Sequence, residues 1–496
     1  MIETGVEFEK LSREELLVTV KELSLQALRV HELEHELDQL KRLIFGSRHE
    51  RFVPSVPQEQ LHLGLITEPK PSPPPLVQRI EYTRTPKETT EKIPVRMKLP
   101  PSLPRERVIL EPQEDTSGMR KIGEEITEEL ERIPGKLFVR QYVRPKYARP
   151  NGEGVVIADL PVRPIDKGIA GPGLLAQIVI DKYTDHLPIH RQIQRFEREG
   201  IKLSSSTLTG WISGTCSLLE PLHAVLRKQV LSSKYLQADE TPIKVLDQDK
   251  KGTTHRGYHW VYHAPAERLV LFDYREGRGR EGPGECLKDF QGYLQTDGYA
   301  VYEDYQKKTG IMLLHCMAHG RRKFEEARDN DKARAEYALT EIQKLYAIER
   351  TIKEEGLSEE QTLHIRQAES VPVLSSLKEW MLDTYKAVLP QSAIGQALHY
   401  SLQRWDRLLI YTTDGRLQID NNLVENTIRP VAIGRKNYLF AGSHNGARRA
   451  AMLYSLLGTC KINNVNPFEW LRHTLEKIPL HPVNQLQQLL PHNYKV

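Results

Sequence analysis

The pentapeptide YLQAD at residues 235–239 recurs as YLQTD at residues 293–297, with four of its five positions unchanged. Each copy predicts a short β-strand, in which alternate side chains point to the same face. The tyrosine, the glutamine and the final aspartate of each copy would therefore share one face. For one aspartate alone, a surface turn would be the better interpretation. The duplicated context instead favours a common site that contains both Asp239 and Asp297.

The elements predicted around these two strands form an α/β pattern. Two more strands (258–263 and 269–274) and a short helix (282–290) are predicted between the copies. A helix (299–305), a strand (311–314) and a basic helix that starts near His319 are predicted after them. The order βββαβαβ is the ribonuclease-H-like arrangement, in which the first and fourth strands are neighbours. Asp239 and Asp297 would then lie on strands about 4.8 Å apart.

Two carboxylates on neighbouring strands repel each other unless a cation lies between them. Hard oxygen ligands suit Mg²⁺ or Mn²⁺. A pair of such ions about 3.5–4 Å apart can activate a water or a 3′-hydroxyl and stabilise the departing oxygen. We therefore predict that Asp239 and Asp297 are catalytic metal ligands, with Mg²⁺ or Mn²⁺ as the cofactor.

A third ligand is expected from a later helix, and the segment DNNLVENTIRP at residues 420–430 supplies it in Glu425. Asp420 or Asn421 would cap this helix, and Pro430 would end it. Asp420 is a second candidate for the metal. Glu425 and Arg429 are four residues apart and share a helix face, a spacing that also describes an ordinary surface ion pair.

Basic residues near these acids are candidates for contacts with phosphate. GRKN at 434–437 and GARR at 446–449 place cations beside glycine. Cys316 and His319 have two interpretations. In the first, Cys316 is a core cysteine and His319 begins a helix. In the second, His319 contacts the DNA backbone together with its basic neighbours. The predicted DNA-binding residues are His319, Arg321, Arg322, Lys323, Arg429, Arg435, Lys436, Arg448 and Arg449.

Residues 10–50 predict a long amphipathic helix. Its apolar or small residues recur in steps of three and four, with one slip near Val30. This heptad pattern favours a leucine-zipper-like coiled coil that joins copies of the chain into a homo-oligomer. The alternative is a helix packed against its own domain. The apolar positions are Leu16, Val20, Leu23, Ala27, Val30, Leu33, Leu37, Leu40 and Ile44.

The segments between this helix and the first strand differ in composition. A proline-rich linker is followed by a small β-rich module, whose basic residues either face solvent or contact nucleic acid. In the next segment, a helix over 187–196, a break at Glu199–Gly200 and an N-cap near Ser204 outline a helix-turn-helix. Any helical hairpin shares that outline. The predicted domains are the coiled coil (10–50), the linker (51–118), the β-rich module (119–165), the helical segment (166–231), the catalytic domain (232–460, with a helical insertion at about 326–410) and a C-terminal helical tail (461–496).

Composition and charge limit the classes of protein to which this chain can belong. The 496 residues carry a formal net charge of +4 and a mean hydropathy of −0.51. No stretch has the 18 or more apolar residues that a membrane span needs, and the first ten residues lack the pattern of a signal peptide. The four scattered cysteines argue against a disulfide framework. These features predict a cytoplasmic protein without a membrane partner.

Several motifs together resemble the IS66 family of insertion-sequence transposases. They are ADET at 238–241, TDGY at 296–299, AHGRRKF at 318–324, DNNLVE at 420–425, LIFG at 43–46, GPGLL at 171–175 and Gly442-Ser443. The resemblance implies a DDE transposase of a bacterial mobile element, with an N-terminal leucine zipper and action on terminal inverted repeats. It also implies that Asp239, Asp297 and Glu425 are the acidic triad.

The chain departs from the family pattern at one place. Many relatives carry a cysteine-rich zinc finger, but the corresponding stretch, Ser117 to Val155, contains no cysteine. Because tetrahedral zinc needs four thiolate or imidazole ligands, we predict that the chain binds no zinc.

The predicted function is transposition by phosphoryl transfer. The ends of the element would be cleaved, and their 3′-hydroxyls would be joined to target DNA near the bacterial nucleoid. The partners would be DNA, a second copy of the chain and other proteins of the same element. One alternative is a ribonuclease-H-like nuclease or resolvase without strand transfer. Another is a non-catalytic DNA-binding protein derived from a transposase. A purely structural coiled-coil protein would leave the two matching strands unexplained.

Overall fold

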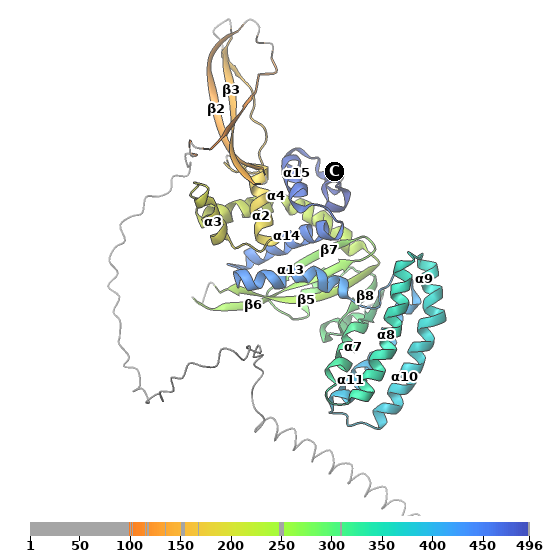
Figure 1. The fold of residues 1–496 in the computed structure, drawn as a ribbon. Helices are drawn as coiled ribbons and strands as arrows, with labels where there is room; N and C mark the ends of the chain where they lie inside the picture. The colour runs from red at the N-terminus through yellow and green to blue at the C-terminus, as the bar shows by residue number, and fades with distance from the viewer. Residues whose placement is uncertain are drawn as a thin grey trace, which may run out of the picture. The chain divides into compact units, whose positions relative to one another are not determined.

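The structure is a computed structural model that describes residues 99, 101, 103–114, 116, 119–133, 135–149, 154–166, 168–247, 252–307 and 310–494 (Figure 1). The predicted coiled coil and most of the predicted linker lie outside these residues. The described part is a mixed α/β fold with two mixed sheets, as the sequence predicts.

The first sheet has four strands: β1 (Arg105–Ile109), β2 (Arg120–Ile133), β3 (Lys136–Ala148) and β4 (Val155–Ile157). β2 and β3 form a long antiparallel hairpin, and Gly135, in the turn, has the positive φ of +82° that favours glycine. β1 lies in the stretch that the sequence assigns to the linker. It pairs in parallel with β3, because its RERVI sequence supplies strand-forming residues to an open edge.

Ion pairs neutralise much of the charge on the hairpin. Arg144 lies 2.7 Å from Glu125, and Arg105 lies 3.2 Å from Glu128. Arg140 lies 3.7 Å from the buried carboxylate of Glu131. The stretch that is basic in sequence is therefore balanced by acids on the facing strand.

The second sheet contains both copies of the pentapeptide. Its strands are β5 (Tyr235–Leu246), β6 (Thr254–Ala264), β7 (Leu269–Arg275), β8 (Gly292–Thr296) and β9 (Ile311–His315), in the order β7-β6-β5-β8-β9. β5, β6 and β7 are antiparallel, whereas β8 and β9 are parallel to β5. Helix α5 (Glu281–Cys286) precedes β8, and α6 (Ala300–Glu303) with the 3-10 turn η3 (Asp304–Lys307) precedes β9. The predicted adjacency of the first and fourth strands is confirmed.

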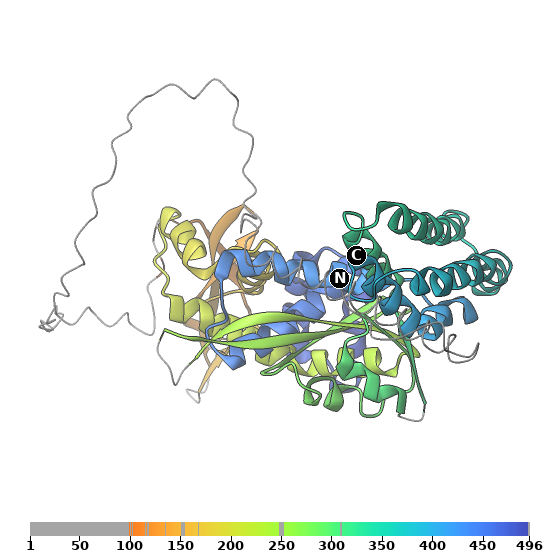
Figure 2. The same ribbon diagram turned by 90° about the horizontal axis from the view of Figure 1, so that it is seen from below.

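Helices cover both faces of this sheet, which Figure 2 shows nearly edge-on. On one face, the Trp260 ring of β6 lies 6.0 Å from the ring of Tyr302 in α6. On the other face, the neighbouring His259 contacts Tyr454. Asp239 is paired with Val261 and Glu240 with Trp260, so the two acids face opposite sides of the sheet. The helices on the His259 side are α13 (Asn422–Tyr438) and α14 (His444–Ile462), and α4 (Ser205–Ser232) packs against α14 and β7.

The helical segment before β5 consists of α2 (Pro172–Tyr183), α3 (Ile189–Arg198) and α4. Gly200 has a φ of +86° between α3 and α4, and Ser204 caps α4 by accepting a hydrogen bond from the Thr207 N–H, as predicted. α4 buries Trp211 and a row of leucines. The C-terminal elements are α15 (Pro467–Lys477), which packs on α2, and the 3-10 turns η6 (Ile478–Leu480), η7 (Val483–Leu489) and η8 (Pro491–Asn493).

A group of helices between β9 and α13 encloses a second core (Figure 1). This core contains Phe324, Met381 and Trp405, and it meets the sheet through Tyr235 and Leu314. The helices are α7 (Met317–Glu326), α8 (Lys332–Glu354), α9 (Glu359–Ile365), the π-helical turn η4 (Arg366–Ser370), α10 (Val371–Lys386), α11 (Ala393–Gln403), α12 (Trp405–Leu409) and the 3-10 turn η5 (Ile410–Thr413). We call the part from α8 to η5 the helical insertion.

The prediction that Pro430 ends its helix is wrong, because α13 continues to Tyr438. Proline removes one backbone N–H from a helix interior. α13 nevertheless buries Val424 and Thr427 before the proline and Val431 and Gly434 after it. This face packs on β5 and β6, so tertiary burial outweighs the local preference.

All four cysteines are buried with free thiols. Cys316 is the expected core cysteine, and its Sγ accepts a hydrogen bond from the Asn421 N–H at 3.4 Å. None of the helices in the described ranges has the length and apolar character needed to cross a membrane.

Candidate active site

The two pentapeptides pair with each other in register. Tyr235 lies opposite Tyr293, and Gln237 lies opposite Gln295. The recorded pairing ends at these glutamines, and the two aspartates follow beyond it. Asp239, within β5, and Asp297, directly after β8, therefore occupy equivalent positions just past the end of this parallel pairing.

Each aspartate is partly buried and held by a local hydrogen bond. The Oδ1 atom of Asp239 accepts from the Glu240 N–H at 2.7 Å, and Oδ1 of Asp297 accepts from the Tyr299 N–H at 2.8 Å. The backbone carbonyl of Asp297 accepts from the hydroxyl of Tyr400 at 2.8 Å. These contacts leave Oδ2 of both aspartates outside the local turns.

Glu425 reaches the site from the first turn of α13. Its Oε1 atom lies 3.8 Å from Nε2 of His319 and 3.9 Å from an Arg322 guanidinium nitrogen. Both of these residues belong to α7, which directly follows β9. Burial lowers the pKa of His319, although Asp297 and Glu425 both act to raise it.

The pKa of Asp239 is strongly perturbed. Burial raises the pKa of its carboxyl to about 8, and the negative charges of Glu240, Asp297 and Glu425 contribute in the same direction. Asp297, at the end of β8, and Glu425, in α13, are thus close enough to oppose the ionisation of Asp239 in β5. A cation would relieve this repulsion.

Whether these acids can hold a divalent ion depends on the carboxylate oxygens that they offer. Within the described ranges, no three His, Cys, Asp or Glu side chains form a ready-made metal site. Oxygens of the three carboxylates instead contact the local partners described above. Three neighbouring carboxylates are suitable donors for Mg²⁺ or Mn²⁺.

A pocket of about 380 Å³ opens beside Asp297. Cationic and aromatic side chains share its wall, a combination suited to a nucleic-acid backbone. The side chains of Arg322 and Lys323 are 55% and 45% exposed, so they can reach a ligand. The lining residues are Asp297, Gly298, Tyr299, His319, Arg322, Lys323, Glu326 and Tyr400.

Only some of the predicted DNA-binding residues lie near the acids. His319, Arg322 and Lys323 line the pocket beside Asp297, and Arg321 pairs with Glu325 on the same helix at 3.9 Å. Arg429 is exposed on α13, one turn after Glu425, with no ion-pair partner in the described part of the chain.

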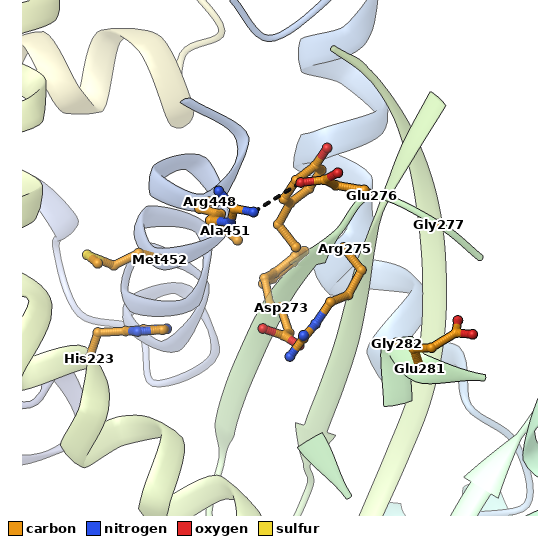
Figure 3. A pocket seen from close by; sticks show the side chains of 12 residues that line it. His223, Asp273, Arg275, Glu276, Gly277, Glu281, Gly282, Arg448, Ala451 and Met452 are labelled. Atoms are coloured by element: carbon orange, nitrogen blue, oxygen red, sulfur yellow. Dashed lines mark hydrogen bonds and ion pairs between the residues drawn. The ribbon is translucent and has the colours of Figure 1, made fainter. Parts of the chain in front are cut away.

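The other predicted cations lie farther along α13 and on α14. Both glycine-flanked clusters fall inside helices. Arg435 donates to the Pro242 carbonyl, and Lys436 is exposed. Arg448 lies 3.1 Å from Glu276 in a separate pocket of about 540 Å³, where charges of both signs meet (Figure 3). Arg449 lies near Cys216 and lowers its pKa against the larger effect of burial.

Sequence analysis did not single out Glu240, which is almost fully buried. Its Oε1 atom accepts from Nε of Arg278 at 2.9 Å, and the Arg278 guanidinium lies 4.1 Å from the Tyr299 ring centre. Burial raises the pKa of Glu240. A fourth acid with its own arginine therefore adjoins the site. The motif ADET contains Glu240, but Arg278 is too distant in sequence for the pairing to be inferred.

Two further cations lie on the β5–β6 hairpin. Lys244 pairs in register with Arg256, both side chains are exposed, and neither has an ion-pair partner among the residues described. Like charges directly opposite each other destabilise a sheet. Lys244 is on the same strand face as Glu240, roughly 13 Å along β5. This placement suggests a role in binding a polyanion.

Comparison with protein families gave four matches along the chain. Residues 167–449 match the model described as Transposase IS66 family, and residues 455–492 match the IS66 C-terminal element. Residues 32–108 match the model described as Transposase C of IS166 homeodomain.

Two curated relatives match nearly the whole chain, and a third matches a short part of it. Uncharacterized protein y4hP of Sinorhizobium fredii is 33% identical over 93% of this chain and 88% of its own length. Uncharacterized protein y4jD of the same organism is 34% identical over 98% of both chains. Uncharacterized protein YuaK of Escherichia coli is 45% identical, over 10% of this chain and 52% of its own length.

The fourth match corrects the prediction about zinc. Residues 114–148 match the model described as the zinc-finger binding domain of transposase IS66. This match contradicts the prediction that the chain binds no zinc, and we withdraw that prediction. The prediction rested on the lack of thiolate and imidazole ligands in this stretch, whereas the match covers the strands of the β2–β3 hairpin as a whole.

Proposed function

This chain belongs to the IS66 transposase family, and from this premise we propose that it cleaves the ends of a mobile element and joins their 3′-hydroxyls to target DNA. Asp239, Asp297 and Glu425 are the proposed catalytic and metal-binding residues. The proposal includes the segment 10–50 as the leucine-zipper-like element that joins two copies, and Mg²⁺ or Mn²⁺ as the cofactor.

One observation carries the proposal. The charges of Asp297 and Glu425 both raise the pKa of Asp239, although the three acids come from segments up to 186 residues apart. The strand order β7-β6-β5-β8-β9 supports a ribonuclease-H-like catalytic domain, because Asp239 lies in its first strand and Asp297 directly follows its fourth. Such convergence is expected of a site that holds cations.

In the proposed reaction, the chain holds and orients the reacting groups. Asp239, Asp297 and Glu425 would hold one or two divalent ions, which polarise the phosphodiester and make a hydroxyl a better nucleophile. Arg322 and Lys323 would bind the phosphates that flank the scissile bond. Because the carboxylates form no bond to DNA, the proposal needs no serine or tyrosine nucleophile.

A strand-transfer assay tests the proposal. Purified full-length protein would be mixed with Mg²⁺, a labelled duplex that carries one end of the element, and a plasmid target. We expect a free 3′-hydroxyl at the element's end and a covalent product joined to the plasmid. Cleavage without joining would favour the nuclease alternative. DNA binding without cleavage, in either Mg²⁺ or Mn²⁺, would favour the non-catalytic alternative.

The raised pKa of Asp239 predicts how pH affects the metal-free protein. Between about pH 4 and pH 8, the folded state keeps the Asp239 proton while the unfolded state loses it, so stability falls as pH rises. Asp239→Asn removes this effect. In EDTA at pH 8.5, the variant should melt about 2–5 °C above the parent, and the difference should shrink toward pH 4. Calorimetry over this pH range is the measurement, and a lower melting temperature for the variant at pH 8.5 would contradict the assignment.

The exposed pair Lys244 and Arg256 predicts a DNA contact on the β5–β6 hairpin. Changing both residues to Ala should weaken DNA binding about fivefold to tenfold at 0.1 M salt and lower the salt slope by about two. Thermal stability should not fall, because a repulsive pair is removed. Fluorescence anisotropy against salt concentration measures both effects. A matched control changes the exposed Lys288 and Lys332 to Ala, and equal loss in both double variants would rule out a specific contact.

A further inference from the structure

The chain reaches Glu425 through a short segment, Gln418–Asn421, which we call the tether. α13 begins at Asn422, so Glu425 lies one helical turn beyond the tether. Any shift of the tether therefore moves the Glu425 carboxylate relative to Asp239 and Asp297. Displacements of about 1 Å are large on the scale of catalytic geometry.

The sheet holds the backbone of the tether. Gln237 and Gln295 are fully buried, and they bind each other at 3.0 Å through their side-chain amides. Gln237 also donates to the Asp420 carbonyl at 2.9 Å, and Gln295 donates to the Gln418 carbonyl at 2.9 Å. The Tyr235 hydroxyl accepts from the Gln418 N–H at 3.1 Å. Tyr235, Gln237 and Gln295 of the two pentapeptides thus all bind this one segment.

The start of α7 adds two contacts to the same backbone. The Met317 N–H donates to the Ile419 carbonyl at 3.1 Å, and the Asn421 N–H donates to Sγ of Cys316. The sheet and the α7 start together therefore engage each of the four tether residues through its backbone.

The helical insertion holds a different part of the tether. The hydroxyl of Tyr346, in α8, donates to Oδ2 of Asp420 at 2.9 Å. The other oxygen of Asp420 accepts from the N–H of Asn422, the first residue of α13, at 3.1 Å. One carboxylate thus joins the insertion to the first turn of the helix that carries Glu425.

Within the insertion, η4 also binds the segment that leads into the tether. The guanidinium of Arg366 donates to the carbonyls of Tyr411 and Asp414 at 2.9 and 3.0 Å. Gln367 donates to the Thr412 carbonyl at 2.7 Å. Residues 411–421 therefore connect the insertion directly to α13.

We propose that Tyr346 is a positioning residue through which the helical insertion sets the place of Glu425 in the active site. The inference rests on the proposed function, because it treats Glu425 as a metal ligand. The Gln237–Gln295 pair belongs to the sheet that carries the aspartates, so it supplies a fixed reference. Tyr346 belongs to a separate core, so movement of the insertion, for example on DNA binding, changes the position of Glu425 through this hydroxyl.

The test removes a single oxygen atom. Tyr346→Phe should weaken Mn²⁺ binding about threefold to tenfold, because the Asp420 carboxylate loses a charge-assisted hydrogen bond. Electron paramagnetic resonance of free Mn²⁺ measures this affinity without any reaction. Cleavage should need correspondingly more Mg²⁺ and approach the parent rate at saturation, while the melting temperature stays within about 1 °C of the parent.

A matched control and a second variant separate positioning from general damage. Tyr337 is in the same helix, is 43% exposed and stacks on Trp380, and its hydroxyl has no partner among the described residues, so Tyr337→Phe should leave both readouts unchanged. Gln295→Met weakens the sheet side of the tether and should also lower Mn²⁺ affinity. The loss in the Tyr346→Phe/Gln295→Met double variant should differ from the sum of the single losses, since both residues act on one segment.

Three outcomes would overturn the inference. The first is parental Mn²⁺ affinity and Mg²⁺ dependence in Tyr346→Phe. The second is a fall of several degrees in its melting temperature, which would make the role structural. The third is a parent protein that neither binds Mn²⁺ nor cleaves DNA. That result would first overturn the proposed function, and it is distinguishable because the parent fails as well as the variant.

Discussion

Asp239→Asn, Asp297→Asn and Glu425→Gln are each expected to lower the rate of DNA strand cleavage by a factor on the order of a thousand or more. Each change keeps the size of the side chain and removes one negative charge from the proposed metal site. The three acids act on the same ions, so a double variant should be little worse than a single one. Single-turnover cleavage of a labelled duplex in Mg²⁺ measures the rate.

DNA binding provides the control for this prediction. It should be unchanged or slightly stronger in the three variants, because the carboxylates repel phosphate when metal is absent. Asp289→Asn is the matched substitution, since the Asp289 side chain is 86% exposed on the loop before β8. Its cleavage rate should equal that of the parent. Cleavage that persists in any of the three acid variants would remove that residue from the proposed triad.

The second large effect concerns the stability of the helical insertion. Arg366 is 2% exposed and forms two parallel hydrogen bonds with Glu349, at 2.8 and 2.7 Å. Arg366→Met would leave the Glu349 carboxylate and two backbone carbonyls without this partner. We expect the free energy of unfolding to fall by about 3–5 kcal/mol, as for other buried ion pairs that lose one member. Urea denaturation followed by tryptophan fluorescence is the measurement, because Trp380 and Trp405 report on this core.

Two further variants test the cause of this loss. In Arg366→Met/Glu349→Leu, both charges are absent, so much of the stability should return. Arg416→Met breaks an exposed pair with Asp414 at 2.6 Å and should change stability by about 1 kcal/mol or less. Equal losses for Arg366→Met and Arg416→Met would show that the buried ion pair contributes no more to the free energy of unfolding than the exposed one.

The repeated pentapeptide illustrates how far sequence reasoning reached. The order of strands and helices around its two copies was enough to predict that β5 and β8 are neighbours, and the register confirms this. Both aspartates could be nominated because they follow the same three letters. Nothing local, however, indicated that Gln237 and Gln295 bind the backbone of residues 418 and 420. Those partners are more than 120 residues away in the chain, and their carbonyls carry no sequence signature.

Helix α13 shows where local rules failed. Proline predicted an end at residue 430, yet the helix extends to Tyr438, because residues on both sides of the proline are buried against β5 and β6. The pairing of Glu240 with Arg278 was missed for a related reason. A buried ion pair depends on which loops meet in space, and hydrophobic periodicity does not encode that.

The amino-acid sequence alone determined the mixed α/β class, the order of strands and helices around the acids, and the family resemblance. These properties follow from short-range patterns: alternation in strands, caps and glycine breaks in helices, and motifs a few residues long. Tertiary structure alone decided which cationic side chains lie next to the acids and how strongly the pKa of Asp239 is raised. It also decided which hydrogen bonds join the insertion to the segment before Glu425. These properties depend on burial and on distances between residues far apart in the chain, and both arise only when the chain has packed.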